Sequence, residues 1–207
     1  YFEEKGLVSP QELTNLRNEQ TAGTNTDWFM LLDGDEVWPD YSLKKLLSAI
    51  KNASQEKIAV VVRSRNCVGD IFHFLPENRG EYELLGMKGH LNIRAFKKSP
   101  EFKWTGIYPL EAYSSQDGSI NNQDKKLFFL DKYYWHLTHL KRTSVKNDFK
   151  INKKKFELGI TADKRDIPEI FFSQRPEIVP YPFLKQSFPE KLLAMILTLV
   201  KDIKYKI

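Results

Sequence analysis

The sequence predicts an α/β protein in which helices flank a mixed sheet, followed by a basic helical extension. Three observations support this prediction. The unbroken apolar run Trp28–Leu32 has the length and composition of a strand buried on both faces of an α/β sheet. Lys57–Arg65 is rich in β-branched residues and is typical of a second strand. Between these runs, apolar residues repeat at helical spacing over residues 43–50.

Capping signals predict where the first helices begin. Ser9–Glu12 combines an N-cap serine, a proline at the first helical position and a glutamate that closes a capping box. The helix that begins there is expected to bury Leu13 and Leu16. Trp28–Leu32 should then form the central strand of the sheet, and Asp40 should cap the next helix.

Three further strands are expected after the β-branched run. They are Leu91–Phe96, Phe102–Tyr108 and Leu127–His139, the last in the main sheet, with polar turn residues at 121–126. Cys67–Gly89 is broken by glycine and proline, and a long irregular stretch of this kind is usually either a functional loop or a flexible one.

The chain changes character near residue 141. Lys141–Lys155 is crowded with Lys and Arg and has apolar residues along one side of a predicted helix. Pro168–Pro182 favours extended backbone. Ser187–Glu190 repeats the helix-start signature and leads into the apolar helix Leu192–Ile203. We therefore divide the chain into an α/β domain over residues 1–140 and a basic helical extension over residues 141–207.

Composition narrows the class of protein. The chain has 207 residues, of which 41% are hydrophobic, enough to build a core, and a net charge of +5. This charge is too small, without a basic motif, to indicate a nucleic-acid partner. Cys67 is the single cysteine, which excludes an internal disulfide and fits a reducing, cytoplasmic compartment. No apolar run reaches the length of about 18 residues that spans a membrane.

An acidic turn follows the first apolar run directly. Asp33, Asp35 and Glu36 surround Gly34, which is expected to let the backbone turn so that both aspartates face one point. Open α/β sheets bind ligands at the carboxyl ends of their strands. Hard carboxylate oxygens suit Mg²⁺ or Mn²⁺ carrying a diphosphate. An acidic surface loop is the plain alternative.

Three blocks in order resemble the middle of a family 2 glycosyltransferase with the Rossmann-like GT-A fold. The first is Arg17-Asn18 followed by the strand that ends in Asp33-Gly34-Asp35. The second is Leu91–Phe96 followed by Lys103–Gly106 and then Glu111. The third is Trp135–Arg142, which looks like the late histidine-bearing strand of that family. The resemblance covers roughly residues 10 to 145 and lacks the first, nucleotide-binding strands, so the domain is expected to be incomplete at its N-terminus.

The resemblance implies an activity and its partners. A sugar would pass from a nucleotide-diphosphate sugar to a hydroxyl of a glycan, lipid or protein acceptor, with inversion and with Mn²⁺ or Mg²⁺. Asp35 would bind the ion, Asp33 the ion or the donor ribose, and Glu36 would order the turn. Glu111 would be the general base. The other implied contacts are to the donor, by Arg17, Asn18, Arg94 and Arg142, and to the metal, by His136 or His139.

Several of these roles have plainer alternatives. Glu111 is nearly as well explained as a surface residue, and Arg94 and Arg142 as solvated charges. On a regular strand His136 and His139 would face opposite sides, and His136 lies on the polar one. His136 is therefore the preferred ligand, and a structural histidine is the alternative. Isolated histidines (His73 and His90) are expected to be structural or exposed. Two tryptophans, Trp38 and Trp104, are either sugar-stacking platforms or core residues.

Other classes of function remain open. The first is a sugar- or phosphate-binding module of the same fold without activity. The second is a haloacid-dehalogenase-like phosphatase, whose Asp-x-Asp-x-Val loop Asp33–Val37 would match. Such an enzyme needs a further acidic pair, and Asp70 is the nearest candidate, with no second acid at useful spacing. The basic tail also allows peripheral contact with the anionic inner face of a membrane, although helices that are solvated or packed on the domain explain it better.

Overall fold

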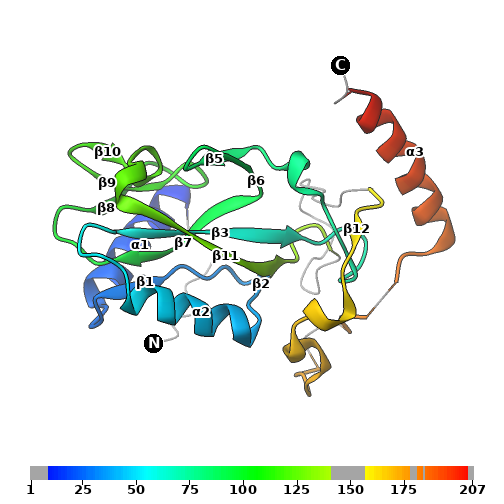
Figure 1. Ribbon diagram of the computed structural model, residues 1–207, viewed down its shortest axis with the longest axis horizontal. Coiled ribbons are helices and arrows are strands. Elements are labelled where there is room, and N and C mark those ends of the chain that lie inside the picture. Colours follow the sequence, from blue (N-terminus) through cyan, green and yellow to red (C-terminus); the bar gives the residue numbers. More distant parts are fainter. Residues whose placement is uncertain (1–8, 141–156, 178–180, 184, 205–207) are drawn as a thin grey trace.

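The main sheet has five strands and joins segments from the whole first two-thirds of the chain (Figure 1). The structure is a computed structural model that describes residues 9–140, 157–177, 181–183 and 185–204. The mixed α/β architecture predicted from the sequence is confirmed. In spatial order the strands are β1 (Trp28–Met30), β7 (Leu91–Lys97), β3 (Ala59–Asn66), β11 (Leu127–His136) and β2 (Glu36–Val37).

Strand direction brings three carboxyl ends to one edge of this sheet. β7 is antiparallel to both β1 and β3, and β11 is parallel to β3, so β1, β3 and β11 all run the same way. β2 returns antiparallel to β11, with Glu36 opposite His136. The turn after β1, residue Asn66 and residue His136 therefore lie at the same edge, where open α/β sheets bind ligands.

The predicted central strand, Trp28–Leu32, is instead an edge strand. Within the described residues β1 pairs only with β7, while β3 occupies the centre of the sheet. Phe29 and Leu31 pack on the core of one face and Trp28 and Met30 on the core of the other. All four stay only partly buried, because no described strand covers the outer side of β1.

The alternation of β3 separates two hydrophobic layers. Ala59 and Val61 face one layer, and Val60 and Val62 face the other; all four are fully buried. The second layer is closed by α2 (Asp40–Lys51), which contributes Leu46 and lies along one face of the sheet (Figure 1). Asp40 does not cap this helix, contrary to prediction. Pro39 is the N-cap, and Asp40 pairs with Lys44 one turn later.

A small second sheet covers the opposite face. Its strands are β8 (Lys103–Thr105), β9 (Ala112–Ser115) and β10 (Gly118–Ser119), so the predicted strand Phe102–Tyr108 is much shorter than expected. Aromatic rings join it to β7, with Trp104 and Tyr113 both within 5.5 Å of Phe96 between ring centroids. Trp104 is therefore a core residue, one of the two alternatives for it.

The first helix, α1 (Pro10–Gly23), has the predicted capping box but an unexpected packing face. Leu13 and Leu16 are only partly buried. Polar side chains on the adjacent stripe dock the helix on β8. Thr14 donates to the carbonyl of Gly106 at 3.1 Å, and the Thr21 hydroxyl accepts from the indole of Trp104 at 3.1 Å. Hydrogen bonds therefore contribute to docking this helix on β8.

The predicted irregular stretch Cys67–Gly89 contains regular elements. They are β4 (His73–Phe74) and the hairpin of β5 (Tyr82–Leu84) with β6 (Met87–Gly89). The two turn residues, Leu85 and Gly86, have φ of 54° and 69°. Positive φ at both positions defines a two-residue hairpin turn that usually has the sequence Asn-Gly. Leu85 gives no such signal, so the sequence does not predict this hairpin.

Part of the predicted extension packs on the end of the main sheet. β12 (Ile160–Thr161) pairs with β4, and Ala162 joins Cys67 and Trp135 in a third core cluster. The predicted helix Lys141–Lys155 lies outside the described residues. Short 3-10 helices complete the chain, at Glu77–Arg79, Ile120–Asn122, Asp124–Lys126, Lys164–Asp166 and Glu169–Phe172.

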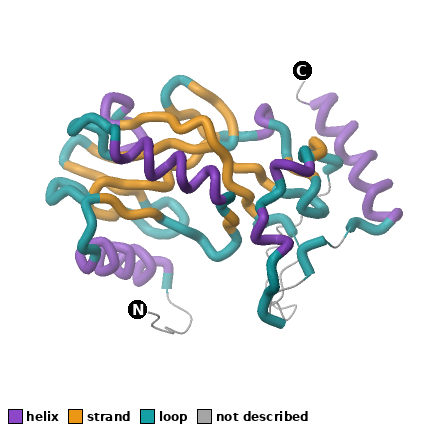
Figure 2. Tube along the Cα trace, turned by 60° about the horizontal axis from the view of Figure 1, so that its bottom comes forward, coloured by secondary structure: helices purple, strands orange, loops and turns teal. Residues whose placement is uncertain are grey.

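The last helix, α3 (Phe188–Lys204), stands away from the main sheet in both views (Figures 1 and 2). It contacts the rest of the chain through the buried Ala194 and through polar side chains. Lys201 binds Glu157 at 2.6 Å, and Thr198 accepts from the backbone N–H of Leu158 at 3.0 Å. Within the part of the chain that is described, no helix is long and apolar enough to cross a bilayer.

Candidate functional site

Side chains from five separate segments converge on the acidic turn that follows β1. The turn is closed by a hydrogen bond from the N–H of Glu36 to the carbonyl of Asp33 at 3.0 Å. Gly34 within it has no positive φ, and a Cβ there would meet nothing within 4 Å. The expected need for glycine is therefore not steric, and Asp33 and Asp35 contact different partners.

Arg94, on β7, is the main partner of the turn. Its guanidinium pairs with Asp33 at 3.1 Å and with Glu36, and its Nε donates to the hydroxyl of Tyr134 at 3.2 Å. The Glu36 side chain is fully buried, and the Asp33 side chain is 41% exposed. Because the guanidinium presents several donors in a rigid fork, one arginine fixes one buried and one open carboxylate.

Arg17 brings a second cation to the turn from α1. It pairs with Glu111 and lies 4.0 Å from the carboxylate of Asp33. Its guanidinium also stacks 5.2 Å from the ring centre of Trp104. The side chain of Glu111 is only 5% exposed, and its Oε2 is buried with no hydrogen-bond partner among the described residues. Arg17 therefore connects the acidic turn to the predicted general base.

Asp35 faces His136, at the carboxyl end of β11. The Nε2 of His136 lies 3.6 Å from a carboxylate oxygen of Asp35, and both side chains are about a quarter exposed. The other ring nitrogen, Nδ1, lies 3.0 Å from the Oδ1 of Asn66, at the end of β3. Asp35 and His136 therefore form a partly exposed carboxylate–imidazole pair at this edge.

Burial controls protonation in the Arg94 cluster. It is the main cause that raises the pKa of Glu36; Asp33 acts in the same direction, and Arg94 opposes it. Burial also raises the pKa of the Tyr134 phenol, so the hydroxyl stays neutral. For Arg94, burial favours the neutral form, but nearby Tyr134, Glu36 and Asp33 outweigh it and raise the pKa. The guanidinium therefore remains charged.

The donor set fits a divalent cation shared with a phosphate ligand. The described residues hold no group of three or more His, Cys, Asp or Glu side chains arranged around one point. Mg²⁺, however, is commonly held by one or two carboxylates together with water and substrate phosphates. With every carboxylate ionised and His136 neutral, the site carries four negative and two positive charges, a surplus of two negative charges that matches one divalent ion. The charged residues are Asp33, Asp35, Glu36, Glu111, Arg17 and Arg94.

Three predicted site residues lie elsewhere or outside the described chain. The amide of Asn18 is occupied by the backbone of Trp104, with hydrogen bonds of 2.8 and 2.9 Å. β11 ends at His136, so His139 lies in a turn, and the argument that a regular strand puts the two histidines on opposite faces is wrong. Arg142 lies outside the described residues.

The strand that carries His136 also departs from the predicted alternation. Its register shifts between Leu130 and Tyr133, and the predicted polar face carries Tyr134, which is fully buried. Tyr134 stacks on Trp38 with 5.0 Å between ring centroids. Trp38 thus packs behind the acidic turn, where its indole donates to Glu36 at 3.4 Å.

The acid considered for a phosphatase site has other contacts. Asp70 is buried, binds the imidazole of His73 at 2.7 Å and accepts from the backbone N–H of Phe72 at 2.9 Å. These contacts order the loop that contains β4. They leave the phosphatase alternative without support at the acidic turn.

Sequence reasoning missed Asn66 and Tyr134. Asn66 closes β3, one residue beyond the predicted strand end, and the rule that ligands gather at the carboxyl ends of parallel strands could have identified it. Tyr134 could not have been found, because the register shift within β11 decides which face its hydroxyl reaches.

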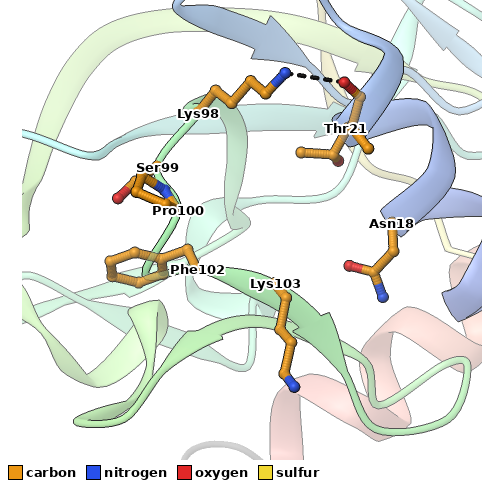
Figure 3. A pocket seen from close by; sticks show the side chains of 8 residues that line it. Asn18, Thr21, Lys98, Ser99, Pro100, Phe102 and Lys103 are labelled. Carbon is orange, nitrogen blue, oxygen red and sulfur yellow. Dashed lines mark hydrogen bonds between the residues drawn. The ribbon is translucent and has the colours of Figure 1, made fainter.

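A separate hollow lies between α1 and the segment Lys98–Lys103. It has a volume of about 340 Å³, with Thr21 and Lys98 among its lining residues (Figure 3). Lys98 donates to the carbonyls of Ala22 and Thr24 at 2.9 and 2.7 Å. Phe102 and Lys103 line the opposite side. Because Lys98 is already bound to the helix end, the hollow offers no acid–base chemistry comparable to the acidic turn.

Comparison with known proteins does not identify a family. No family model matches the chain, and a search of curated proteins finds no match.

Proposed function

We propose that this chain is part of a metal-dependent glycosyltransferase that uses a nucleotide-diphosphate sugar. One observation carries the proposal, which is the convergence of distant, oppositely charged segments on an Asp-Gly-Asp turn at the carboxyl ends of three parallel strands. The residues that meet there are those that resemble the GT-A glycosyltransferases. We also propose that the domain has the GT-A fold and that the sugar is transferred to an acceptor hydroxyl with inversion at the anomeric carbon.

The two halves of the turn have different roles in this proposal. Asp35, with His136 beside it, would hold Mn²⁺ or Mg²⁺, and the ion would supply Lewis-acid help by neutralising charge on the diphosphate leaving group. Asp33, partly exposed and held by Arg94, would contact the donor ribose. Arg94 and Arg17 fix the turn and add positive charge close to where the donor phosphates would bind.

The role of Glu111 separates an enzyme from a binding module. A general base must reach the proton that it abstracts. Glu111 is buried and paired with Arg17, so it can act only after Arg17 moves toward a phosphate of the bound donor. If Arg17 stays in place, the same geometry supports the second candidate, a sugar- or phosphate-binding module without turnover.

A turnover assay decides between these two candidates. The chain is incubated with Mn²⁺, UDP- and GDP-sugars and a panel of sugar acceptors, and release of UDP or GDP is measured. We expect release that Asp35→Asn reduces by more than the roughly ten- to hundredfold loss typical of residues that only support a metal ligand. Asp27→Asn, an exposed aspartate at the opposite end of β1, is the matched control. Binding of UDP or GDP without any release would favour the binding module.

We further propose that α3 lies on an anionic membrane surface. Its outer side chains are between 42% and 63% exposed, although all are large and apolar, namely Leu192, Leu193, Met195, Ile196, Leu199 and Val200. Lys185 and Lys191 are exposed near its start. An amphipathic helix with apolar residues flanked by lysine is typical of peripheral membrane proteins. This arrangement would place the acidic turn close to a lipid-linked or envelope acceptor.

A further inference from the structure

A chain of hydrogen bonds leads away from His136 into the interior of the protein. The Nδ1 of His136 lies 3.0 Å from the Oδ1 of Asn66. The Nδ2 of Asn66 lies 2.9 Å from the Nδ1 of His90, and the Nε2 of His90 lies 3.0 Å from the carbonyl oxygen of Pro76. His90 is 6% exposed, so this chain is shielded from water at its inner end.

The carbonyl of Pro76 sets the direction of every bond in the chain. A carbonyl can only accept, so the Nε2 of His90 must carry the proton. A neutral imidazole then accepts at Nδ1, which requires the NH₂ group of Asn66 on that side. The oxygen of Asn66 therefore faces His136, and the orientation of the amide follows from its partners.

Ser64 supports the same orientation of the amide. Its hydroxyl donates to the Oδ1 of Asn66 at 3.0 Å, and the Nδ2 of Asn92 in turn donates to the Ser64 hydroxyl at 3.3 Å. The Oδ1 of Asn66 thus accepts from the Ser64 hydroxyl and faces the Nδ1 of His136. With a flipped amide, the Ser64 hydroxyl would lose this 3.0 Å bond and keep only the longer one to the carbonyl of His90, at 3.4 Å.

The orientation of the Asn66 amide determines which ring nitrogen of His136 faces Asp35 as an acceptor. Because the Oδ1 of Asn66 only accepts, the Nδ1 of His136 carries the proton. The Nε2 of a neutral His136 then presents a lone pair to the carboxylate of Asp35, 3.6 Å away. Two acceptors that face each other repel, and a cation between them removes the repulsion. A metal-binding histidine commonly donates its other ring N–H to a carbonyl oxygen in this way.

We propose that Asn66, held in orientation by His90, is a positioning residue that keeps His136 in its Nδ1–H tautomer and presents Nε2 to a divalent cation beside Asp35. This inference rests on the metal site of the proposed function. It assigns a role to Asn66 and His90, which the resemblance to glycosyltransferases does not mark. If the role of Asn66 were only structural, its hydrogen bond to His90 would link β3 to the loop before β7, and the tautomer of His136 would not depend on it.

The tautomer can be measured in the metal-free protein. Long-range ¹⁵N–¹H NMR spectra at about pH 8, above the usual imidazole pKa, report which ring nitrogen of each histidine carries the proton. We expect His136 as Nδ1–H and His90 as Nε2–H. In Asn66→Ala, where Asp35 can accept from Nε2–H, His136 should change to the Nε2–H form. His136 as Nε2–H in the wild-type protein would overturn the proposal.

Metal binding provides a second, independent test. Mn²⁺ affinity is measured by electron paramagnetic resonance in the wild type and in folded variants. Asn66→Ala should weaken binding by about ten- to hundredfold. Asn66→Asp, which keeps an acceptor toward Nδ1, should retain more affinity. Asn121→Ala removes the amide of an exposed asparagine in the 3-10 helix Ile120–Asn122, outside this chain of hydrogen bonds, and it should bind as the wild type does.

These outcomes separate this inference from the proposed function. Equal Mn²⁺ affinity in the wild type and Asn66→Ala, or no Mn²⁺ binding by the wild type, overturns the positioning role. If the tautomers and affinities are as expected but no nucleotide sugar is bound or turned over, the positioning role stands and only the glycosyltransferase proposal fails.

Discussion

Arg94 organises the acidic turn through three different partners. It ties the buried Glu36 and the open Asp33 to the hydroxyl of Tyr134, and Tyr134 in turn stacks on Trp38. A lysine in this place would offer one point charge in place of a rigid fork of donors. The turn is therefore held by a buried charge pair on its inner side, while its outer side remains open to ligands.

Glu36 should make stability depend on pH. Burial raises its pKa in the folded protein above the ordinary value of 4.5, so the folded state binds more protons than the unfolded state between those two values. Stability therefore falls as pH rises through that window. Relative to Glu36→Gln, the free energy of unfolding of the wild type should decrease by about 1.4 kcal/mol for each unit of raised pKa.

Urea unfolding of both proteins between about pH 4 and pH 8 checks this expectation. A difference between the two proteins that does not change with pH, or that grows in favour of the wild type at higher pH, would contradict the account of Glu36.

At the scale of elements, helix α1 delivers Arg17 to the site through a polar interface. Asn18, Thr14 and Thr21 bind the backbone or indole groups of the Trp104–Gly106 segment. Arg17 is the neighbour of Asn18 and contacts both Glu111 and Asp33. The position of the Arg17 guanidinium thus depends on hydrogen bonds along the helix.

Asn18→Ala should therefore loosen α1. It removes two hydrogen bonds to the backbone of Trp104, each worth about 0.5–1.5 kcal/mol, so we expect a loss of about 1–3 kcal/mol in the free energy of unfolding. Asn15→Ala, at an exposed position of the same helix, should change stability by less than about 0.5 kcal/mol. Equal losses in the two variants would show that the amide of Asn18 does not dock the helix.

At the scale of the whole molecule, the carboxyl edge of the main sheet, where β3 and β11 end, points toward the side of the structure on which β12 and α3 lie (Figure 1). The α3 helix contacts the rest of the chain through Glu157, Leu158 and Arg79 and leaves its apolar side chains exposed. In the described residues nothing covers that side of the helix. This combination favours a surface partner for α3 over a purely structural role.

Vesicle binding tests that partner. Sedimentation with vesicles of phosphatidylserine and phosphatidylcholine should recover the wild-type chain, while Ile196→Glu should lower the partition coefficient by about tenfold or more, since burying one isoleucine contributes about 1.5–3 kcal/mol. Ile170→Glu changes an isoleucine of similar exposure outside α3, 60% against 53%, and should have little effect. Equal losses in both variants, or no binding by the wild type, would contradict membrane docking.

Local patterns predicted much of the fold but not the arrangement of its strands. The capping box of α1 and the strands β3, β7 and β11 follow from periodicity and β-branched composition. The edge position of β1 does not follow from them, because the apolar run Trp28–Leu32 is compatible with a strand that has either one neighbouring strand or two. The hairpin at Leu85-Gly86 was missed because its turn lacks the usual residues.

Residues of the candidate site could be predicted where they directly follow or end a strand that is recognisable in the sequence. Asp33, Asp35 and Glu36 follow one strand, and His136 ends another. The pairing of Arg17 with Glu111 and the support of His136 by Asn66 join residues far apart in the chain, so only the packed structure reveals them. The same holds for Asn18, whose amide is used by the backbone of Trp104.

The most direct test of the central claim is a calorimetric titration of UDP and GDP into the chain, with and without Mn²⁺. The account predicts that one of the nucleotides binds only when Mn²⁺ is present, that Asp35→Ala abolishes this binding, and that Asp27→Ala retains it. Binding that needs no metal, binding that survives in Asp35→Ala, or no binding of either nucleotide would contradict a nucleotide-sugar site at the acidic turn.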